Sequence, residues 1–360
     1  MNLVLTGPMG VGKTTVGARV AKILGWDFSD TDMIITQRAG HSINEIFAKE
    51  GERRFRTIES NIVEEVSKKD STVIATGGGV VLDPQNMRRL RSKGVIVNLE
   101  ANPAVLLKRL KEVTDRPLLT DMKGMKRLLK ERSGVYSNTD HRIDTSTMTI
   151  EEVVEKVYMI ALMPVVRICG CIAGDRAEED LRTAAQNGAS MIELRLDLIP
   201  KPEVRKLVQM SAVPVLATDR DDKKNLIEAI RAGCEFVDVE YASPKKDDLI
   251  RLARKFGCKV IVSFHEYEEV PQRVPDKGEA DLLKLAVWMN SKEDIQDLLA
   301  LYGHRKDIII VGMGPHGVHM RVIAPLLGSY LTFCYIREKT APGQLQLETM
   351  NKIYKELGLR

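Results

Sequence analysis

GPMGVGKTT, at residues 7–15, lies between an apolar run at 2–6 and a helical pattern that continues to Leu24. A strand, a glycine-rich turn and a helix in this order form the setting of a phosphate-binding loop. The glycines let backbone N–H groups approach phosphate oxygens, Lys13 reaches the β- and γ-phosphates, and the Thr14 hydroxyl is a Mg²⁺ ligand. The alternative is a glycine-rich turn that binds nothing. Every position of the motif is filled and its flanks are correct, so we expect a nucleotide site here.

Length and composition limit the class of protein. The chain has 360 residues, of which 44% are hydrophobic and 29% are charged, and two domains are expected at this length. Its net charge of +4 implies neither a nucleic-acid nor a membrane partner. The five cysteines, an odd number with no secretory signal before them, indicate a cytoplasmic protein. Cys169 and Cys171 share one face of an expected strand, where burial is a better explanation than metal binding. The sequence does not decide whether the chain forms a homodimer.

Two patterns of secondary structure meet near Met163 and Pro164. The first half alternates strands, at 2–6, 72–75 and 95–99, with helices, and ends in a helix at 150–162. The second half has eight short apolar runs, at 167–171, 191–195, 213–217, 236–239, 260–263, 282–287, 308–311 and 331–334. Amphipathic helical stretches separate most of these runs, which is the pattern of a (β/α)₈ barrel. We therefore predict an α/β protein with a P-loop NTPase-type parallel sheet over residues 1–162 and a compact (β/α)₈ TIM barrel over residues 165–360.

Polar motifs in the first half indicate a phosphoryl-transfer site. Asp30, Thr31 and Asp32 follow a short expected strand, where carboxylates can organise the water shell of a metal and hold a substrate hydroxyl; a generic acidic turn is the alternative. Arg56 lies in GERRFRTIE, and three consecutive glycines at 77–79 follow the strand at 72–75. Such glycines usually mean that something approaches the backbone closely.

Two further arginines complete this set. Arg116 lies in TDRPLLTD, a polar segment between helices that is suited to close over a bound nucleotide as a lid, and Arg132 precedes Tyr136 by four residues. Together the motifs GxxGxGKT, DTD, FR, GGG, RPLL and RxxxY occur in the order found in shikimate kinase, which residues 1 to about 162 resemble.

The resemblance implies roles for individual residues. The ATP-binding residues are expected to be Gly10, Val11, Gly12, Lys13, Thr14, Thr15, Arg109 and Arg116. The shikimate-binding residues are expected to be Asp32, Arg56, Gly78 and Arg132. Lys13, Asp32 and Arg116 are then catalytic, because Asp32 orients the attacking hydroxyl and the two cations neutralise the transferring phosphoryl group. Mg²⁺ is expected on Thr14 and, through water, on Asp30, and Arg109 is expected to lie against adenine.

Polar residues also gather at the expected carboxyl ends of the barrel strands, where active sites of (β/α)₈ barrels lie. They are Glu193, Arg195, Arg220, Asp238, Glu240, His265, Lys284, Arg321, Thr340 and Gln344. Lys284 stands out because it lies inside the apolar run DLLKLAV, where an ammonium is costly to bury and a neutral amine, able to form a Schiff base, is favoured. The alternative is a snorkelling lysine or a structural ion pair with Glu193 or Glu240. His265 in the neighbouring strand, a candidate general base and acid, favours chemistry.

This half resembles type I 3-dehydroquinate dehydratase over residues 165 to about 357. The matching stretches are ELRLD at 193–197, SFHEY at 263–267, DLLKLAV at 281–287, GMGPHGVHMR at 312–321 and TAPGQ at 340–344. The resemblance implies an imine between Lys284 and the C3 ketone and proton transfers by His265 at C2 and at the departing C1 hydroxyl, with no cofactor. The dehydroquinate-binding residues are then Glu193, Arg195, Arg220, Arg321, Thr340 and Gln344. After Arg220 the family often has a glutamate that orients the histidine, but this chain reads DDKKN, so we expect Asp238 to replace it.

These resemblances predict a bifunctional shikimate-pathway enzyme. The first half would phosphorylate the shikimate 3-hydroxyl with ATP and Mg²⁺, and the second would dehydrate 3-dehydroquinate to 3-dehydroshikimate. The two steps are not consecutive, because an NADPH-dependent reduction lies between them, so direct transfer of product is not expected. One alternative is a regulatory nucleotide-binding module fused to one enzyme, against which the acceptor-side residues such as Asp32 and Arg56 argue. Another is an aldolase-like or inactive barrel; the presence of both His265 and Lys284 argues against an inactive one.

Overall fold

The chain forms two compact units, Met1–Met163 and Pro164–Arg360. The structure is a computed structural model that describes residues 1–113, 122–137, 139–221, 223–302, 305 and 307–359. Each unit contains its own parallel sheet. Among the described residues no helix combines the length and the apolar sequence that crossing a membrane requires.

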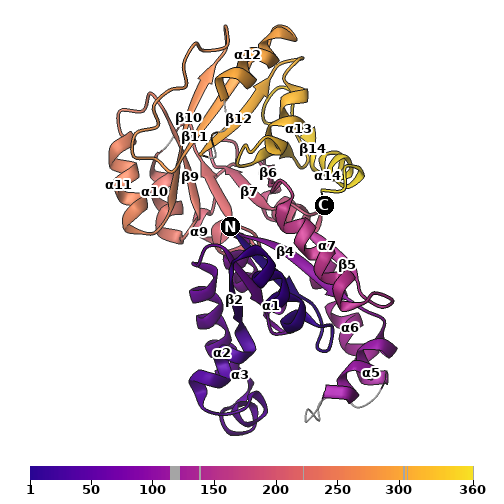
Figure 1. The fold of residues 1–360 in the computed structure, drawn as a ribbon. Helices are drawn as coiled ribbons and strands as arrows, with labels where there is room; N and C mark the ends of the chain where they lie inside the picture. The colour runs from indigo at the N-terminus through magenta and orange to yellow at the C-terminus, as the bar shows by residue number, and fades with distance from the viewer. Residues whose placement is uncertain (114–121, 138, 222, 303–304, 306, 360) are drawn as a thin grey trace. The chain divides into compact units, whose positions relative to one another are not determined.

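The first unit, coloured indigo to magenta in Figure 1, is built on a five-stranded sheet with the order β2-β3-β1-β4-β5. The strands are β1 (Asn2–Thr6), β2 (Asp27–Asp30), β3 (Thr72–Ala75), β4 (Gly94–Glu100) and β5 (His141–Asp144). β1 lies at the centre, paired with β3 on one side and β4 on the other. All five of its residues are buried, as is typical of a central strand of a parallel sheet. The phosphate-binding loop predicted after residue 6 therefore leaves the middle of the sheet.

Helices cover both faces of this sheet. They are α1 (Lys13–Leu24), α2 (Thr31–Ala39), α3 (Ile43–Ser67), α4 (Pro84–Arg91), α5 (Pro103–Val113), α6 (Met122–Ser137) and α7 (Ile150–Leu162). Val4 packs with Ile62 of α3 and Leu90 of α4 in one apolar cluster. Its neighbour Leu5 points to the other face, toward Gly17 of α1, and α1 packs on α7. Alternate residues of β1 thus fill two separate layers, as the period of two in a strand requires.

Local sequence signals account for where several helices start. Ser42 and Glu45 form a reciprocal capping box at the start of α3, and Thr149 and Glu152 form another at the start of α7. Each box satisfies backbone N–H groups that a helix N-terminus leaves without partners. The predicted helix at 150–162 coincides with α7 for this reason.

The second unit is a curved parallel sheet with the order β12-β11-β10-β9-β8-β7-β6-β13-β14. Its strands are β6 (Ile168–Ile172), β7 (Met191–Arg195), β8 (Val215–Thr218), β9 (Phe236–Glu240), β10 (Lys259–Glu266), β11 (Leu282–Trp288), β12 (Ile308–Met313), β13 (Thr332–Tyr335) and β14 (Leu345–Gln346). Just before β13, the backbone N–H of Tyr330 donates to the carbonyl of Ile308 in β12 at 2.9 Å, which brings the two sides of the sheet together. The eight predicted strands correspond to β6–β13, and the predicted α/β fold class is confirmed.

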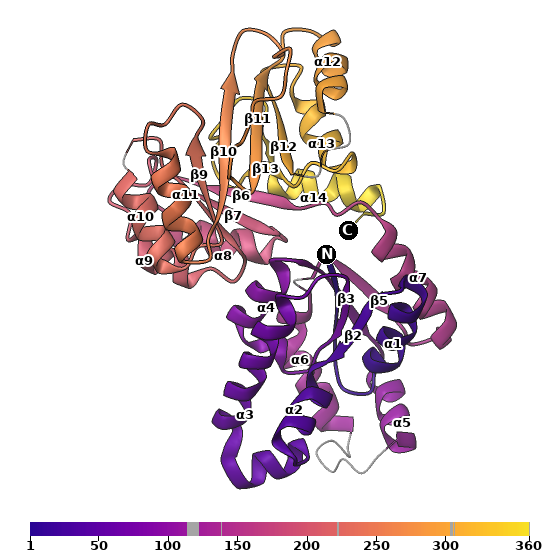
Figure 2. The same ribbon diagram turned by 60° about the vertical axis from the view of Figure 1, so that its left-hand side comes forward.

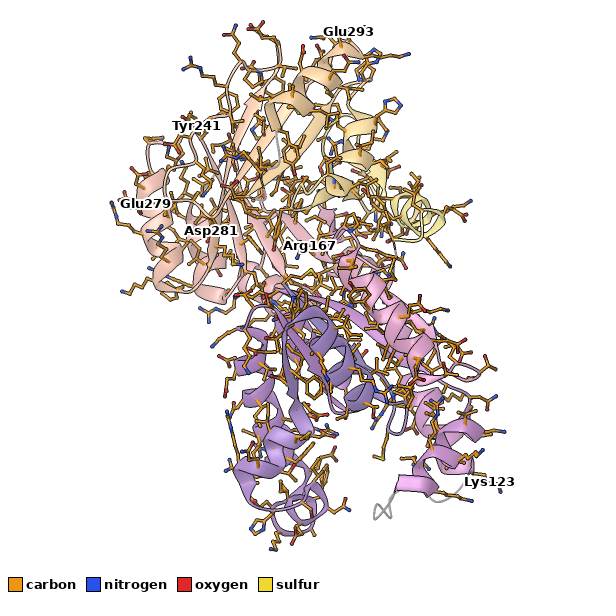
Figure 3. The ribbon with its side chains drawn as sticks, viewed as in Figure 1. Lys123, Arg167, Tyr241, Glu279, Asp281 and Glu293 are labelled. Atoms are coloured by element: carbon orange, nitrogen blue, oxygen red, sulfur yellow. The ribbon has the colours of Figure 1, made fainter. Side chains whose placement is uncertain are left out.

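The helices of this unit lie on the outside of the curved sheet. They are α8 (Ala177–Gln186), α9 (Val204–Met210), α10 (Lys223–Ala232), α11 (Lys246–Lys255), α12 (Glu293–Tyr302), α13 (Val318–Leu326) and α14 (Leu347–Glu356). Figure 2 shows α10 and α11 beside β9 and β10, and α13 beside β12. At the amino end of the strands, Asp281, labelled in Figure 3, accepts a hydrogen bond from the backbone N–H of Val260 at 2.8 Å. This contact ties the start of β11 to the start of β10.

The inward-facing side chains change from apolar to polar along the strands. The apolar ones near the amino ends are Cys169, Met191, Leu216, Phe236, Ile261, Leu282, Ile309 and Leu331, which belong to one cluster. Two residues further along five of the strands, on the same face, are the buried polar side chains Glu193, Thr218, Asp238, Ser263 and Lys284. The barrel therefore has an apolar floor, above which polar groups face the carboxyl ends of the strands.

Candidate active sites

The phosphate-binding loop has the backbone that its glycines predict. Gly10 and Gly12 adopt positive φ values of 80° and 101°, in the left-handed region that other residues rarely enter. The loop curls around the side chain of Lys13, whose Nζ donates hydrogen bonds to the carbonyls of Gly7 and Pro8 at 2.8 and 2.9 Å. An ammonium group is thus held at the turn, next to the N-terminus of α1. The ammonium charge and the helix N-terminus both favour the binding of an anion there.

Thr14 and Asp30 come together beside this loop. The Thr14 hydroxyl donates to Oδ2 of Asp30 at 2.6 Å, while Oδ1 of Asp30 accepts from the backbone N–H of Met33 and caps α2. A hydroxyl and a carboxylate are hard oxygen donors, which is the chemistry that Mg²⁺ prefers. The two side chains predicted to hold the metal therefore fit it in kind and in position.

Gly77 and Gly79 leave room for two predicted site residues. A Cβ atom on Gly77 would lie 2.5 Å from Oδ1 of Asp32, and one on Gly79 would clash with the guanidinium group of Arg56. The groups that approach the backbone closely are thus Asp32 and Arg56. The carbonyl of Gly78 accepts hydrogen bonds from Nη1 of Arg132 and from the Tyr136 hydroxyl, both at 2.9 Å.

Of the predicted acceptor-side residues, Asp32, Arg56 and Arg132 thus contact one short loop at residues 77–79, which contains the fourth, Gly78. Arg109 is held elsewhere, through hydrogen bonds to the hydroxyl and carbonyl of Thr145 at 3.0 and 2.9 Å. Arg116 lies outside the described residues.

Arg56 has a buried partner that the sequence analysis missed. Its Nη1 lies 2.8 Å from Oε2 of Glu59, a side chain that is 2% exposed, and a second ion pair joins it to Glu52 at 3.2 Å. Burial raises the pKa of Glu59 by more than the neighbouring Arg56 lowers it. Glu59 follows Arg56 by three residues in FRTIE, a spacing that places both on one helix face and that would have predicted the contact.

The barrel contains a cavity of about 470 Å³ at the carboxyl ends of its strands. Its lining includes all the predicted dehydroquinate-binding and catalytic residues of this half, namely Glu193, Arg195, Arg220, His265, Lys284, Arg321, Thr340 and Gln344. Glu240 and Tyr267 also line it, and the Tyr267 ring stacks on His265 at a centroid distance of 6.4 Å. The structure thus gathers residues from most of the strand ends around one space.

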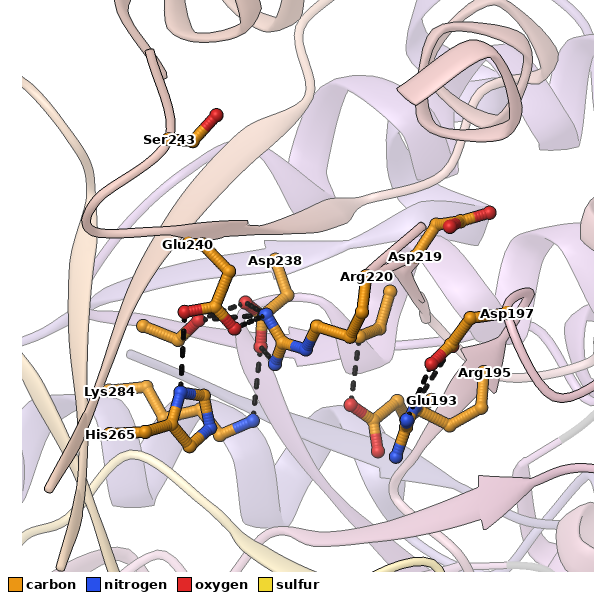
Figure 4. Close-up of polar contacts among 12 residues, drawn as sticks. Glu193, Arg195, Asp197, Asp219, Arg220, Asp238, Glu240, Ser243, His265 and Lys284 are labelled. Atoms are coloured by element: carbon orange, nitrogen blue, oxygen red, sulfur yellow. Dashed lines mark hydrogen bonds and ion pairs between the residues drawn. The ribbon is translucent and has the colours of Figure 1, made fainter. Parts of the chain in front are cut away.

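Asp238 is the partner of Lys284 (Figure 4). Lys284 Nζ lies 3.0 Å from Oδ2 of Asp238, and Asp238 also accepts hydrogen bonds from Arg220 at 3.1 and 3.2 Å and from the Ser263 hydroxyl at 2.5 Å. Burial raises the pKa of Asp238, but Arg220 and Lys284 outweigh this and hold it well below its usual range. The alternative of an ion pair of Lys284 with Glu193 or Glu240 does not hold, because the short side chain of Ser263 lets the lysine reach across β10 to Asp238 on β9.

His265 has a different carboxylate partner from the one predicted. Its Nδ1 lies 3.4 Å from Oε2 of Glu240, which also forms an ion pair with Arg220. The sequence predicts Asp238 in this role, and that prediction is wrong because Asp238 lies deeper, bonded to Lys284. Arg220 bridges the two carboxylates, so it organises the site as well as lining the cavity.

The other predicted substrate-binding residues line the opposite part of the cavity. Glu193 accepts hydrogen bonds from the Thr218 hydroxyl at 2.8 Å and from the Cys171 thiol at 2.9 Å. Burial raises the pKa of Cys171 well above its ordinary value, so this sulfur remains a thiol. Arg195 pairs with Asp197 at 2.6 Å.

Arg321 is a strongly buried cation that still has donor capacity. It is 1% exposed, and its Nη2 donates to the carbonyl of Pro342 at 2.9 Å. Its Nε has no hydrogen-bond partner within the part of the chain that the structure describes. Gln344, in the same loop region, uses its carbonyl to accept from the backbone N–H and hydroxyl of Thr340 at 2.8 and 3.1 Å. The cavity therefore offers a buried positive charge to an anionic group of a ligand.

Comparisons with known proteins match the two units separately. A family model described as shikimate kinase matches residues 9–161, and one described as type I 3-dehydroquinase matches residues 168–360. A shikimate kinase of Caldanaerobacter subterraneus is 49% identical over 159 residues, which cover 43% of this chain and 93% of that protein. A shikimate kinase of Thermodesulfovibrio yellowstonii is also 49% identical, over 43% of this chain and 92% of that protein. The solved 3-dehydroquinate dehydratase of Aquifex aeolicus VF5 is 25% identical, over 53% of this chain and 98% of that chain, with a TM-score of 0.46.

Proposed function

We propose roles for individual residues in two active sites, because this chain belongs to both the shikimate kinase family and the type I 3-dehydroquinase family. It is a bifunctional enzyme of the shikimate pathway with kinase and dehydratase activities. We assign the kinase to residues 1–162 and the dehydratase to residues 165–360. We also propose a cytoplasmic location, which the five buried cysteines, none of them joined in a disulfide, support. A homodimer stays a prediction.

In the kinase site, residues 10–15 would bind the phosphates of ATP, and Thr14 with Asp30 would hold Mg²⁺. The metal, when bound, supplies positive charge to the phosphate oxygens. Lys13 leaves its loop carbonyls for the phosphates and stabilises charge in the transition state. Asp32 orients the shikimate 3-hydroxyl for attack, while Arg56 and Arg132 hold the substrate carboxylate, since a guanidinium fork matches two oxygens. Arg116 would neutralise the transferring group and Arg109 would contact adenine.

In the barrel, Lys284 would attack the C3 ketone of 3-dehydroquinate and form an imine with loss of water. His265 then removes the C2 proton, and the electron pair of that C–H bond moves toward the imine. The C1–O bond breaks, His265 returns the proton to the departing hydroxyl, and a second water leaves. Hydrolysis of the imine releases 3-dehydroshikimate and restores the lysine. The site uses no cofactor in this scheme, and Arg321 would bind the carboxylate of the substrate.

One observation carries the dehydratase assignment: a buried lysine and a histidine line the same cavity above the apolar barrel floor. The test compares Lys13→Ala with Lys284→Ala in the full chain, each variant being the control for the other. Lys13→Ala should lose kinase activity by roughly 3 kcal/mol or more of transition-state stabilisation and keep dehydratase activity. Lys284→Ala should do the reverse. Loss of both activities in either variant, or of neither, would contradict the assignment.

A further inference from the structure

Strand β9 presents two carboxylates to the barrel interior, and each serves a different group. Asp238 and Glu240 are two residues apart, so both point inward. Asp238 is 1% exposed and lies beside Lys284, whereas the Glu240 side chain is 38% exposed and lies at the level of the cavity beside His265. In the register of the sheet, Ser263 is opposite both Glu240 and Lys284, and His265 follows it by two residues.

We propose that Glu240 is the positioning residue for His265. Its carboxylate accepts the Nδ1–H of the imidazole, which leaves Nε2 without a proton and directed at the substrate as the base. A carboxylate on one ring nitrogen fixes both the tautomer and the orientation of a catalytic histidine. The inference rests on the proposed roles of His265 and Lys284. The distance of 3.4 Å is long, but catalytic hydrogen bonds in unliganded enzymes often tighten only when the substrate binds.

The surroundings of Glu240 suit this role. Burial raises its pKa, but the hydrogen bond from His265 and the charge of Arg220 outweigh this and lower it overall, so the group is a carboxylate at neutral pH. Arg220 holds Glu240 in an ion pair and is itself fixed by Asp238. The charged and titratable groups that face His265 and Glu240 are Asp238 of β9, Lys284 of β11, Arg220 after β8 and Tyr267 after β10.

The role of Glu240 is confined to the proton-transfer steps. When His265 takes the C2 proton on Nε2 it becomes an imidazolium, and Glu240 stabilises that cation without taking a proton. The same proton then leaves with the C1 hydroxyl as water, and the neutral tautomer is restored. Imine formation by Lys284 precedes these steps, and the carboxylate that contacts this lysine is Asp238, not Glu240. The two halves of the reaction are therefore separable by mutation.

The test uses Glu240→Gln and Glu240→Ala in the full chain, with Glu269→Gln as a control that removes the same charge from an exposed side chain. Both Glu240 variants should lower kcat of the dehydratase by about 10- to 100-fold, a part of what general acid–base catalysis contributes. Borohydride in the presence of 3-dehydroquinate should still trap Lys284. ¹⁵N NMR should show that the population with a proton on Nδ1 of His265 falls. Glu240→Asp, which keeps the charge on a shorter side chain, should recover part of kcat.

The outcomes separate this inference from the proposed function. An unchanged His265 tautomer and an unchanged kcat in Glu240→Ala would overturn the positioning role. A rise in KM alone, with kcat and tautomer unchanged, would also overturn it, because it would mean that Glu240 acts only by holding Arg220. If borohydride fails to label Lys284 in the unmodified enzyme, the proposed Schiff-base function fails instead, whatever Glu240 does.

Discussion

Replacing Asp238 with asparagine should destabilise the barrel strongly. The carboxylate is 1% exposed and contacts Lys284 at 3.0 Å, Arg220 at 3.1 Å and Ser263 at 2.5 Å. Asparagine has almost the same shape as aspartate and keeps a hydrogen-bond acceptor for Ser263. It carries no charge, so Lys284 and Arg220 lose the buried anion that they share. Breaking a buried ion pair in this way costs about 3–5 kcal/mol. Arg220 keeps Glu240 as a partner, so we expect a loss of stability at the lower end of this range, about 3 kcal/mol.

Urea unfolding of the full chain measures this loss. The chain contains two tryptophans, one in each unit, so fluorescence of Trp288 in a Trp26→Phe background reports on the barrel alone. With a denaturant slope of about 2 kcal/mol/M, the midpoint should fall by roughly 1.5 M.

Asp248→Asn is the matched control, since Asp248 pairs with Arg251 on the surface and both side chains are more than two-thirds exposed, at 73% and 71%. An exposed pair contributes about 0–1 kcal/mol, so the control midpoint should fall by no more than about 0.5 M. Equal midpoints for the two variants would refute the claim that Asp238 neutralises buried positive charge.

Two further predictions follow from the contacts of these sites. The pKa values of Asp238 and Glu240 are lower in the folded state than in the unfolded state. The stability that these carboxylates give the folded state is therefore present above their unfolded pKa values of about 4 and is lost as pH falls through their lower folded pKa values. Urea midpoints between pH 6 and 3 should therefore fall with pH, and less steeply in Asp238→Asn; identical slopes would count against the lowered pKa of Asp238. Gly77→Ala should reduce kcat/KM for shikimate and leave the dehydratase unchanged, because the new Cβ displaces Asp32; an unaffected kinase would mean that Asp32 does not need this approach.

Sequence reasoning succeeded where one residue type is needed at one position. The turn at residues 7–15 needs glycines and a lysine whatever surrounds it, and the rule that barrel sites lie at the carboxyl ends of the strands singled out Glu193, Asp238 and Lys284. The predicted helix at 150–162 agrees with α7, whose start is fixed by a local capping box.

The choice of partner could not be predicted from the sequence. Several inward carboxylates are candidates for Lys284, and the outcome depends on the stagger between β9, β10 and β11 and on a small residue, Ser263, between the lysine and Asp238. Because Asp238 is thereby engaged, only Glu240 is left on β9 to contact His265. Such choices depend on the register of strands distant in sequence, which composition and periodicity do not contain.

The most direct test of the two-site account is to reduce the enzyme with borohydride during turnover of 3-dehydroquinate and to map the adduct by mass spectrometry. The account predicts one modified residue, Lys284, together with irreversible loss of dehydratase activity and full retention of kinase activity. Only an imine intermediate leaves a carbon–nitrogen bond that borohydride can reduce. An adduct on Lys339 in the neighbouring loop, or an enzyme that turns over without any adduct, would contradict the account.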